Sequence, residues 1–565
     1  MDGGRLALPN LSRVLKTIRF EAWSGKASLL FYLCAVMMVA TLILGGAARN
    51  GLLPDAILQL LAIPLLVVSL WRICEVSLTG QMRLALWFCL AIAVLPLLQL
   101  IPLPPWLWTA LPNRQPSAET FDIMGHALPW MPISVSPNAT WLSALSVLPP
   151  LAVFLSTLLL SYRERRWLVL IVLAVGVLSV LIGLIQVSQG QASPFRLFAN
   201  SSATEAVGFF ANRNHFAALN YCLMVFALGW LVYASAALGV PGNQNGKPQE
   251  KRYEFDTASI TKLIASFTVL VILLAGELMA RSRAGLGLTI IALFGVFALG
   301  YSKRSTGFSA MLANKLLFGV IVLVAIFSLQ FALYRVLDRI PDPLYSDRPV
   351  MAGTTIEAAR AYMPIGSGLG SFVPVYAMFE KPEDAQDTYV NRAHNEFLEV
   401  GLEAGVLGLA LIGLFVVWLV RRSVEIWRSA PAPGASQLDW SLIRAATIVP
   451  ALLLAHSLFE FPLRTGAMMA IMVFACALLI EPPVNAAFQE EGQLQAVPRR
   501  TRRRERHVEP ALSSVKPSAK PDASEAPPRS FGQRRGDDSE WAKEWSKAAG
   551  SKGAPQNKQL EPPDN

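Results

Sequence analysis

The sequence predicts an all-α, polytopic membrane protein, and three features lead to that prediction. The 565-residue chain is 53% hydrophobic but only 16% charged, whereas soluble domains carry about 25% charged residues. Its apolar residues gather in runs of about 18–22 that can cross roughly 30 Å of hydrocarbon. After about residue 483 the composition changes to Pro, Ser, Lys, Arg and Glu, which is typical of a disordered tail. These features exclude a soluble enzyme, a secreted disulfide scaffold and a nucleic-acid-binding protein, although the net charge is +10.

Windows of about 19 residues predict about twelve transmembrane helices. They cover residues 28–48, 53–71, 83–101, 141–161, 167–188, 215–237, 260–280, 284–301, 315–334, 396–420, 441–459 and 465–481. Lys and Arg gather in alternate short loops and in the tail, which predicts that both termini are cytoplasmic. The expected organisation is a cytoplasmic segment 1–27, a membrane domain 28–482 and a disordered basic tail 483–565.

The two terminal segments each leave two interpretations open. Within residues 1–27, apolar and basic side chains are interspersed over residues 11–19, which fits either an amphipathic helix on the membrane surface or a disordered arm. The basic run Arg499–Arg506 in the tail is favoured as a plain positive-inside anchor over a contact with anionic lipid headgroups.

Two loops on the predicted outer side are long. The loop of about 102–140 is rich in proline, so it is not one continuous helix. Its Trp106, Trp108, Trp130 and Trp141 are favoured as interfacial anchors, with sugar stacking as the alternative. The loop of about 335–395, before the tenth helix, is longer than a helix connection needs, and such loops tend to carry function.

Polar residues gather at the predicted outer ends of several helices. They are Asn212-Arg213-Asn214-His215, Arg281-Ser282-Arg283, Arg348 with the glycine-rich stretch 366–370, His394-Asn395, and His456 with Glu460. Ionisable residues at membrane depth are costly, so a convergent set is a candidate functional site. No metal-ligand spacing is evident, and the five cysteines show no paired spacing.

Each group also has a simpler structural interpretation. Glu277 and Arg281 are spaced i,i+4 and are expected to neutralise each other, and the same spacing predicts a structural pair of His456 and Glu460. Two interpretations of Arg283 are equally favoured: it binds an anion, or its side chain snorkels to the membrane interface. The glycines of 366–370 indicate a backbone turn rather than a dinucleotide site. His394 is favoured as functional because it opens a helix at the end of the long loop.

Together these motifs resemble the O-antigen ligase/polymerase superfamily of bacterial surface-polysaccharide enzymes, over about residues 140–480. The resemblance is carried by Asn212-Arg-Asn-His215, Ser282-Arg283-Ala-Gly285, Arg348…Gly366-x-Gly-x-Gly370 and His394-Asn395-x-x-Leu398, with His456…Glu460 also fitting. One departure is that Pro349 to Gly353 follow Arg348, without the tryptophan usual there.

The resemblance implies an inner-membrane glycosyltransferase that needs no cofactor or metal. It would move a glycan from an undecaprenyl-diphosphate carrier to a glycan or lipid A-core acceptor on the periplasmic face, within the lipid bilayer and alongside other polysaccharide-assembly proteins. Arg283 would stabilise the diphosphate and His394 would be the general base. Arg213, Arg348, Arg281, Asn212, Asn214, His215 and Asn395 are the expected substrate-binding residues.

Two alternatives stay open. A polymerase of the same superfamily would use the next lipid-linked repeat as its acceptor, in place of lipid A-core, and shares the same motifs. A proton-coupled transporter or lipid flippase would use Glu277, His394 and Glu460 as a relay, but no internal repeat with broken helices is evident.

Overall fold

The computed structural model describes residues 28–47, 53–198, 201–202, 204–237, 257–300, 319, 348–385, 389–432 and 434–483. Residues 1–27, nearly all of the predicted span 315–334, the start of the long loop (335–347) and the tail after residue 483 lie outside this range.

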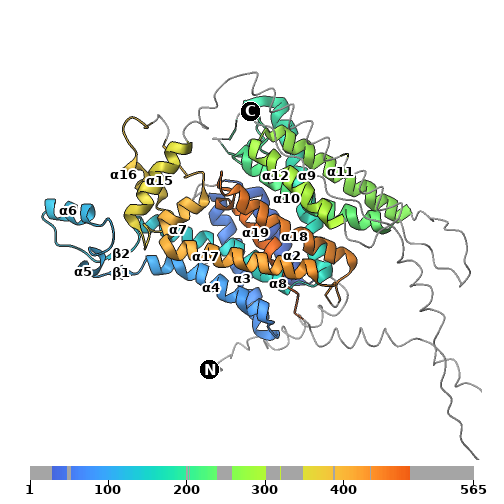
Figure 1. Ribbon diagram of the computed structural model, residues 1–565, viewed down its shortest axis with the longest axis horizontal. Helices are drawn as coiled ribbons and strands as arrows, with labels where there is room; N and C mark the ends of the chain where they lie inside the picture. The colour runs from blue at the N-terminus through green and yellow to red at the C-terminus, as the bar shows by residue number, and fades with distance from the viewer. Residues whose placement is uncertain are drawn as a thin grey trace, which may run out of the picture. The chain divides into compact units, whose positions relative to one another are not determined.

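The described part of the chain is mostly helical (Figure 1). Eight of its helical spans are long and apolar enough to cross a membrane, and three shorter apolar helices accompany them. The long ones are α3 (Leu53–Glu75), α4 (Gly80–Gln99), α7 (Pro137–Ser146) continued by α8 (Leu148–Leu159), α9 (Tyr162–Gln189), α10 (Arg213–Ala237), α11 (Thr257–Ala280), α17 (Glu396–Arg428) and α18 (Gln437–His456). The shorter ones are α2 (Leu29–Leu44), α12 (Arg283–Gly300) and α19 (Gly466–Leu478). Each of them overlaps one of the predicted spans.

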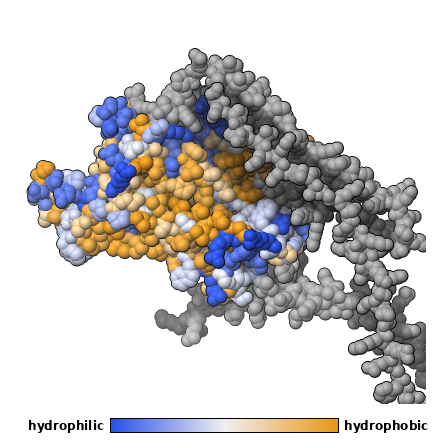
Figure 2. Space-filling model, in the orientation of Figure 1, coloured by the Kyte–Doolittle hydropathy of each residue, from blue (hydrophilic) through white to orange (hydrophobic). Residues whose placement is uncertain are grey.

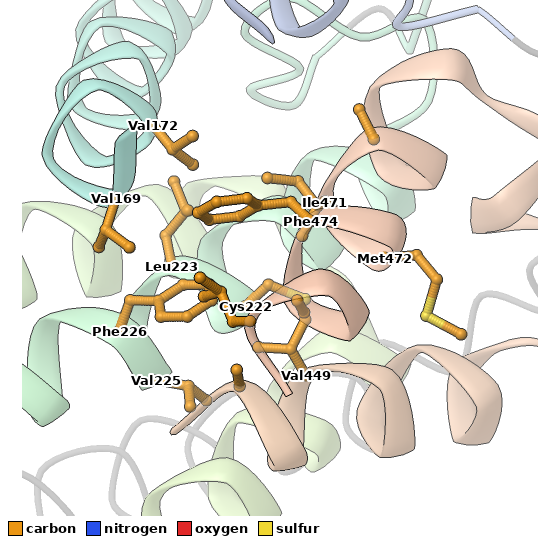
Figure 3. Close-up of a cluster of buried hydrophobic side chains, with 14 of the residues drawn as sticks. Val169, Val172, Cys222, Leu223, Val225, Phe226, Val449, Ile471, Met472 and Phe474 are labelled. Carbon is orange, nitrogen blue, oxygen red and sulfur yellow. The ribbon is translucent and has the colours of Figure 1, made fainter. Parts of the chain in front are cut away.

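Helix α10 lies at the centre of the helical packing. It contacts α9, α11, α12, α18 and α19, and nearly every side chain from His215 to Leu228 is buried. Figure 3 shows apolar side chains from α9, α10, α18 and α19 meeting there; the rings of Phe226 and Phe474 lie 6.0 Å apart. Around this core, Leu60, Trp87 and Leu414 are exposed, and Figure 2 shows apolar residues over much of the visible face. Such an apolar exterior suits a lipid environment.

The proline-rich loop folds into short elements. The strands β1 (Pro102–Leu103) and β2 (Met131–Pro132) pair antiparallel, flanking the helices α5 (Pro105–Trp108) and α6 (Gln115–Ile123). Three of its tryptophans are exposed, as an anchor requires, but Trp108 is only 1% exposed and its Nε1 donates to the Pro129 carbonyl at 2.9 Å. The expectation of an interfacial anchor at Trp108 is therefore wrong, because this ring is the core of the loop.

The described part of the second long loop also carries helices. These are α15 (Arg348–Tyr362) and α16 (Phe372–Phe379), which pack against α17 around a small second core that includes Tyr362, Phe372 and Leu402. Two short 3-10 turns, Gly190–Ala192 and Pro462–Arg464, complete the described elements.

The glycine-rich stretch forms the backbone turn that the sequence predicts. Gly366, Gly368 and Gly370 all have positive φ (89°, 108° and 82°), which favours glycine. The turn lies against a break in α17 at Gly405, whose φ is 58°. Amides of the turn donate to the carbonyls of Leu402 and Glu403, so the turn seats the long loop on α17.

Candidate functional site

The Glu460 carboxylate joins three segments that are distant in sequence. Its Oε1 accepts from Asn214 Nδ2 at 2.6 Å and from Arg348 Nη2 at 2.5 Å, and its Oε2 lies 3.2 Å from His394 Nδ1. The Glu460 side chain is only 1% exposed, whereas that of Arg348 is 25% and that of His394 is 19% exposed. A buried anion thus holds two partly accessible polar groups side by side.

The backbone fixes His394 in an uncommon conformation. Its φ is 51°, in the left-handed region that few non-glycine residues adopt, and such residues cluster at functional sites. The following residue, Asn395, is the N-cap of α17, since its Oδ1 accepts from the amides of Phe397 and Leu398. The imidazole also meets the Phe461 ring edge-on at 4.9 Å. The helix cap and the ring contact together orient the imidazole.

Charge favours one tautomer of His394. Burial alone would raise the pKa of Glu460, but the hydrogen bond and charge of His394, together with Arg348, outweigh it and hold the pKa well below its ordinary range. An ionised Glu460 can only accept hydrogen bonds, so the neutral imidazole carries its proton on Nδ1. The lone pair is then on Nε2, as a general base requires.

Arg348 reaches Glu460 from the long loop. It is the first residue of α15, and its Nη1 also donates to the Phe459 carbonyl at 2.7 Å. Because α15 packs on α16 and α17, the second core holds this arginine at the site.

The residues at the start of α10 divide into distinct roles. Asn212 Oδ1 accepts from the Asn214 amide, which makes Asn212 a local capping residue. Arg213 pairs with Glu205 at 2.5 Å. His215 is 1% exposed, and its ring lies 4.9 Å from Phe461. In the described part of the chain, neither of its ring nitrogens has a hydrogen-bond partner. Of this group, Asn214 is the one that bonds Glu460.

Arg281 and Arg283 lie at the same end of the helical bundle. Arg281 follows the last residue of α11 with a φ of 51°, and Arg283 begins α12. A Cβ added at Gly285 would lie 2.7 Å from Ala217, which is one turn after Asn214. Both arginines are exposed.

The two i,i+4 pairs expected from the sequence do not form. Among the described residues, neither carboxylate oxygen of Glu277 has a hydrogen-bond partner, and both are buried. Arg281 lies beyond the end of α11 and is exposed. His456 Nδ1 instead pairs with the Tyr221 hydroxyl at 2.9 Å, and Glu460 turns to Arg348 and His394. Helix spacing fails here since α18 ends at His456, before Glu460.

A second cluster of carboxylates, which is formed by the buried Glu399 and Glu403, was not identified from the sequence. Glu399 Oε1 accepts from Arg392 Nη1 at 2.7 Å and lies 3.4 Å from Arg464 Nη2. Arg464 also donates to Glu403 at 3.0 Å. Burial would lower the pKa of Arg464, but the Glu399 and Glu403 carboxylates raise it above its ordinary value. The signal in the sequence was the spacing of Glu396, Glu399 and Glu403 on one face of a predicted span.

The described residues offer no obvious metal centre. Among them, no group of three or more His, Cys, Asp or Glu side chains is arranged to hold a metal ion.

Comparison with known proteins finds one family match, over part of the chain. Residues 268–413 match the family model described as O-antigen ligase, while a search of curated proteins gives no match. The matched range runs from α11 into α17 and contains Arg281, Arg283, Arg348 and His394; Asn214 and Glu460 lie outside it. Over residues 268–413 the chain is therefore similar to the O-antigen ligase family, and its long apolar helices fit a membrane protein of that kind.

Proposed function

We propose that the chain is a glycosyltransferase that moves a glycan from an undecaprenyl-diphosphate carrier to an acceptor sugar hydroxyl. The observation that carries the proposal is the contact of a partly exposed His394 with a buried, ionised Glu460, on a chain with an O-antigen ligase domain. This dyad supplies a base, and the arginines beside it supply positive charge.

In the proposed reaction, the acceptor oxygen attacks the anomeric carbon of the lipid-linked glycan. The hydroxyl proton passes to Nε2 of His394 as the new glycosidic bond forms. The bond from the anomeric carbon to the diphosphate oxygen breaks, and the lipid diphosphate leaves with the bonding electrons. Glu460 stays ionised throughout and stabilises the imidazolium, as the carboxylate of a catalytic triad does. Direct displacement inverts the anomeric configuration.

Arginines would balance the charge that develops on the diphosphate. Arg283 and Arg281 are exposed at the ends of α12 and α11, and Arg348 is fixed beside the base by Glu460 and Phe459. Planar guanidinium groups suit phosphate oxygens, with which they make paired hydrogen bonds. Arg213, paired with Glu205, is a fourth candidate further out.

Three residues from the expected substrate-binding set are better explained by structural roles. Asn212 and Asn395 use their side-chain oxygens to cap α10 and α17, and His215 is buried behind Phe461. Asn214 supports Glu460. We therefore restrict the reacting groups to His394 and the arginines.

The same chemistry serves either of two acceptors. A lipid A-core sugar would make the chain a ligase, and the next lipid-linked repeat would make it a polymerase. We propose that the site faces the periplasm from the inner membrane, with both termini cytoplasmic. A periplasm-active reporter fused near residue 385 should then be active, and one fused after residue 500 silent.

The test is a transfer assay with purified protein in lipid nanodiscs. The donor is the lipid-linked glycan extracted from cells that lack the protein, and the acceptors are lipid A-core and the donor itself. We expect His394→Ala to lower the transfer rate by about 10²–10⁴-fold while the protein stays inserted and folded. His126→Ala is the matched control, since His126 lies exposed in the proline-rich loop, and it should transfer at the wild-type rate.

Normal transfer by His394→Ala would refute the proposal. Chains longer than one repeat from the donor alone would identify a polymerase, whereas transfer only to lipid A-core would identify a ligase.

A further inference from the structure

The segment just before His394 is tied to a carboxylate inside α17. Glu399 is completely buried, and its Oε2 accepts the amide of Ala393 at 3.1 Å, while its Oε1 accepts Arg392 Nη1 at 2.7 Å. Both residues immediately preceding His394 are thus bound to one side chain. The chain cannot rotate there without breaking a buried hydrogen bond to a charge.

The residues after His394 are fixed as well. Asn395 caps α17 and donates from Nδ2 to the Leu458 carbonyl at 3.1 Å, and the Glu396 amide donates to the Ser457 carbonyl at 2.9 Å. His394 therefore stands between two anchored segments. A left-handed conformation persists only where the surroundings enforce it, and these anchors enforce it.

The same carboxylate also reaches the segment that carries Glu460. Arg464 lies in the 3-10 turn just after Glu460, and its Nη2 is 3.4 Å from Glu399 Oε1. Glu399 lies in the first turns of α17, just after His394. One buried ion pair thus joins the two chain segments that hold the two members of the dyad.

We propose that Glu399 is a positioning residue, which sets the register between His394 and Glu460 through Ala393, Arg392 and Arg464. The inference rests on the proposed function, because it assigns Glu399 to the same base. Glu399 itself lies too deep to touch a substrate, so its effect must act through His394.

Glu403 provides a matched control on the same helix. It is equally buried and also pairs with Arg464, at 3.0 Å. Its remaining bonds differ, since its Oε1 accepts the amides of Gly370 and Phe372 at 2.9 and 3.2 Å. Loss of Glu403 should weaken the seating of the long loop while the Ala393 anchor stays in place.

The experiment compares Glu399→Gln, Glu399→Asp and Glu403→Gln in nanodiscs. Glutamine has one acceptor oxygen, so it cannot hold Ala393, Arg392 and Arg464 together. We expect kcat of Glu399→Gln to fall by about 10–100-fold with KM for the lipid-linked donor within about twofold. Glu399→Asp keeps the charge and should recover part of kcat.

Histidine NMR provides a readout that a loss of stability alone would not change. The chain has only five histidines, so the ring ¹⁵N signals of His394 can be assigned by loss of signal in His394→Gln. These signals should shift or broaden in Glu399→Gln and stay at their wild-type positions in Glu403→Gln, while those of His215 and His456 stay unchanged in both.

The outcomes distinguish failure of the proposed function from failure of the positioning role of Glu399. If His394→Ala is inactive but Glu399→Gln has wild-type kcat and His394 signals, the positioning role is refuted and the proposed function stands. Equal changes in kcat and in His394 signals for Glu403→Gln and Glu399→Gln would also refute it. If His394→Ala transfers normally, the proposed function fails first.

Discussion

Two arginines, one at each end of the helical bundle, are held in opposite ways. Arg165, in the first turn of α9, is 3% exposed and donates to backbone carbonyls of Thr157, Leu158, Leu160 and Ile480 at 2.6–3.1 Å. Arg348, at the other end, is 25% exposed and bonds a side-chain carboxylate that also holds a histidine. The first arrangement satisfies the last carbonyls of two helices, α8 and α19.

The two arginines differ in what they bind: Arg165 binds backbone carbonyls, whereas Arg348 binds the Glu460 side chain. The last carbonyls of a helix have no donor within the helix. An arginine that donates to them stabilises the helix end. At the Glu460 cluster, Asn214, Arg348 and His394 instead converge on one carboxylate, and the Arg348 and His394 side chains that it holds stay partly accessible. The Glu460 carboxylate therefore differs from Arg165 in holding a titratable side chain, His394, that is partly open to solvent.

Among the variants that test this contrast, Glu460→Gln is expected to change the transfer rate most. The amide nitrogen of glutamine can donate to Nδ1 of His394, which moves the imidazole proton to Nε2 and removes the base. We expect transfer to fall by about 10²-fold or more, measured in the nanodisc assay with the lipid-linked donor.

Its control is Asp439→Asn at the other end. Asp439 is also buried, and it accepts from Ser436 in a capping box and pairs with Arg166 at 3.3 Å. This variant should lose some stability and transfer at the wild-type rate per folded molecule. Equal losses of activity in the two variants would contradict the distinction between the ends.

Arg165→Met is expected to have a smaller effect, and one on stability instead of on the transfer rate. The substitution leaves buried carbonyls without donors, each of which costs about 1–3 kcal/mol. We expect the midpoint of thermal unfolding to fall by about 10 °C, with kcat per folded molecule unchanged. Arg166→Met, at a side chain that is 32% exposed, should change the midpoint by about 2 °C or less. A selective loss of kcat in Arg165→Met would show that this end takes part in the reaction.

The arrangement of spans was the most predictable part of the fold. Long apolar runs report helices directly, because hydrocarbon allows few other structures, and the helices found overlap the predicted runs. The break of α17 at Gly405 was not foreseen, since its cause is the glycine turn 366–370 lying against it. A contact between distant segments leaves no local pattern in the sequence.

The residues at the ends of the long loop could be selected from the sequence, but their connections in space could not. His394 and Arg348 could be selected because of their place at the ends of a long loop. Glu460 was paired with His456 by helix spacing, and only the end of α18 at His456 frees it for His394. Glu460 binds Asn214 and Arg348 only because distant segments of the chain meet in space. The hydrogen bond from the Ala393 amide to Glu399 likewise depends on the folded path of the chain.

The smallest effect expected concerns pH. Glu460 has a folded-state pKa held below its ordinary value by His394 and Arg348, against the opposing effect of burial. Its ionisation therefore stabilises the fold fully above the unfolded-state pKa of about 4.3, and this contribution is lost only as pH falls toward the folded-state value. The difference in unfolding midpoint between the wild type and Glu460→Gln should therefore persist down to about pH 5 and shrink as the pH falls below about 4.3. If the difference disappeared between pH 7 and pH 5, Glu460 would not be the permanently charged group at the site, and the tautomer assigned to His394 would lose its support.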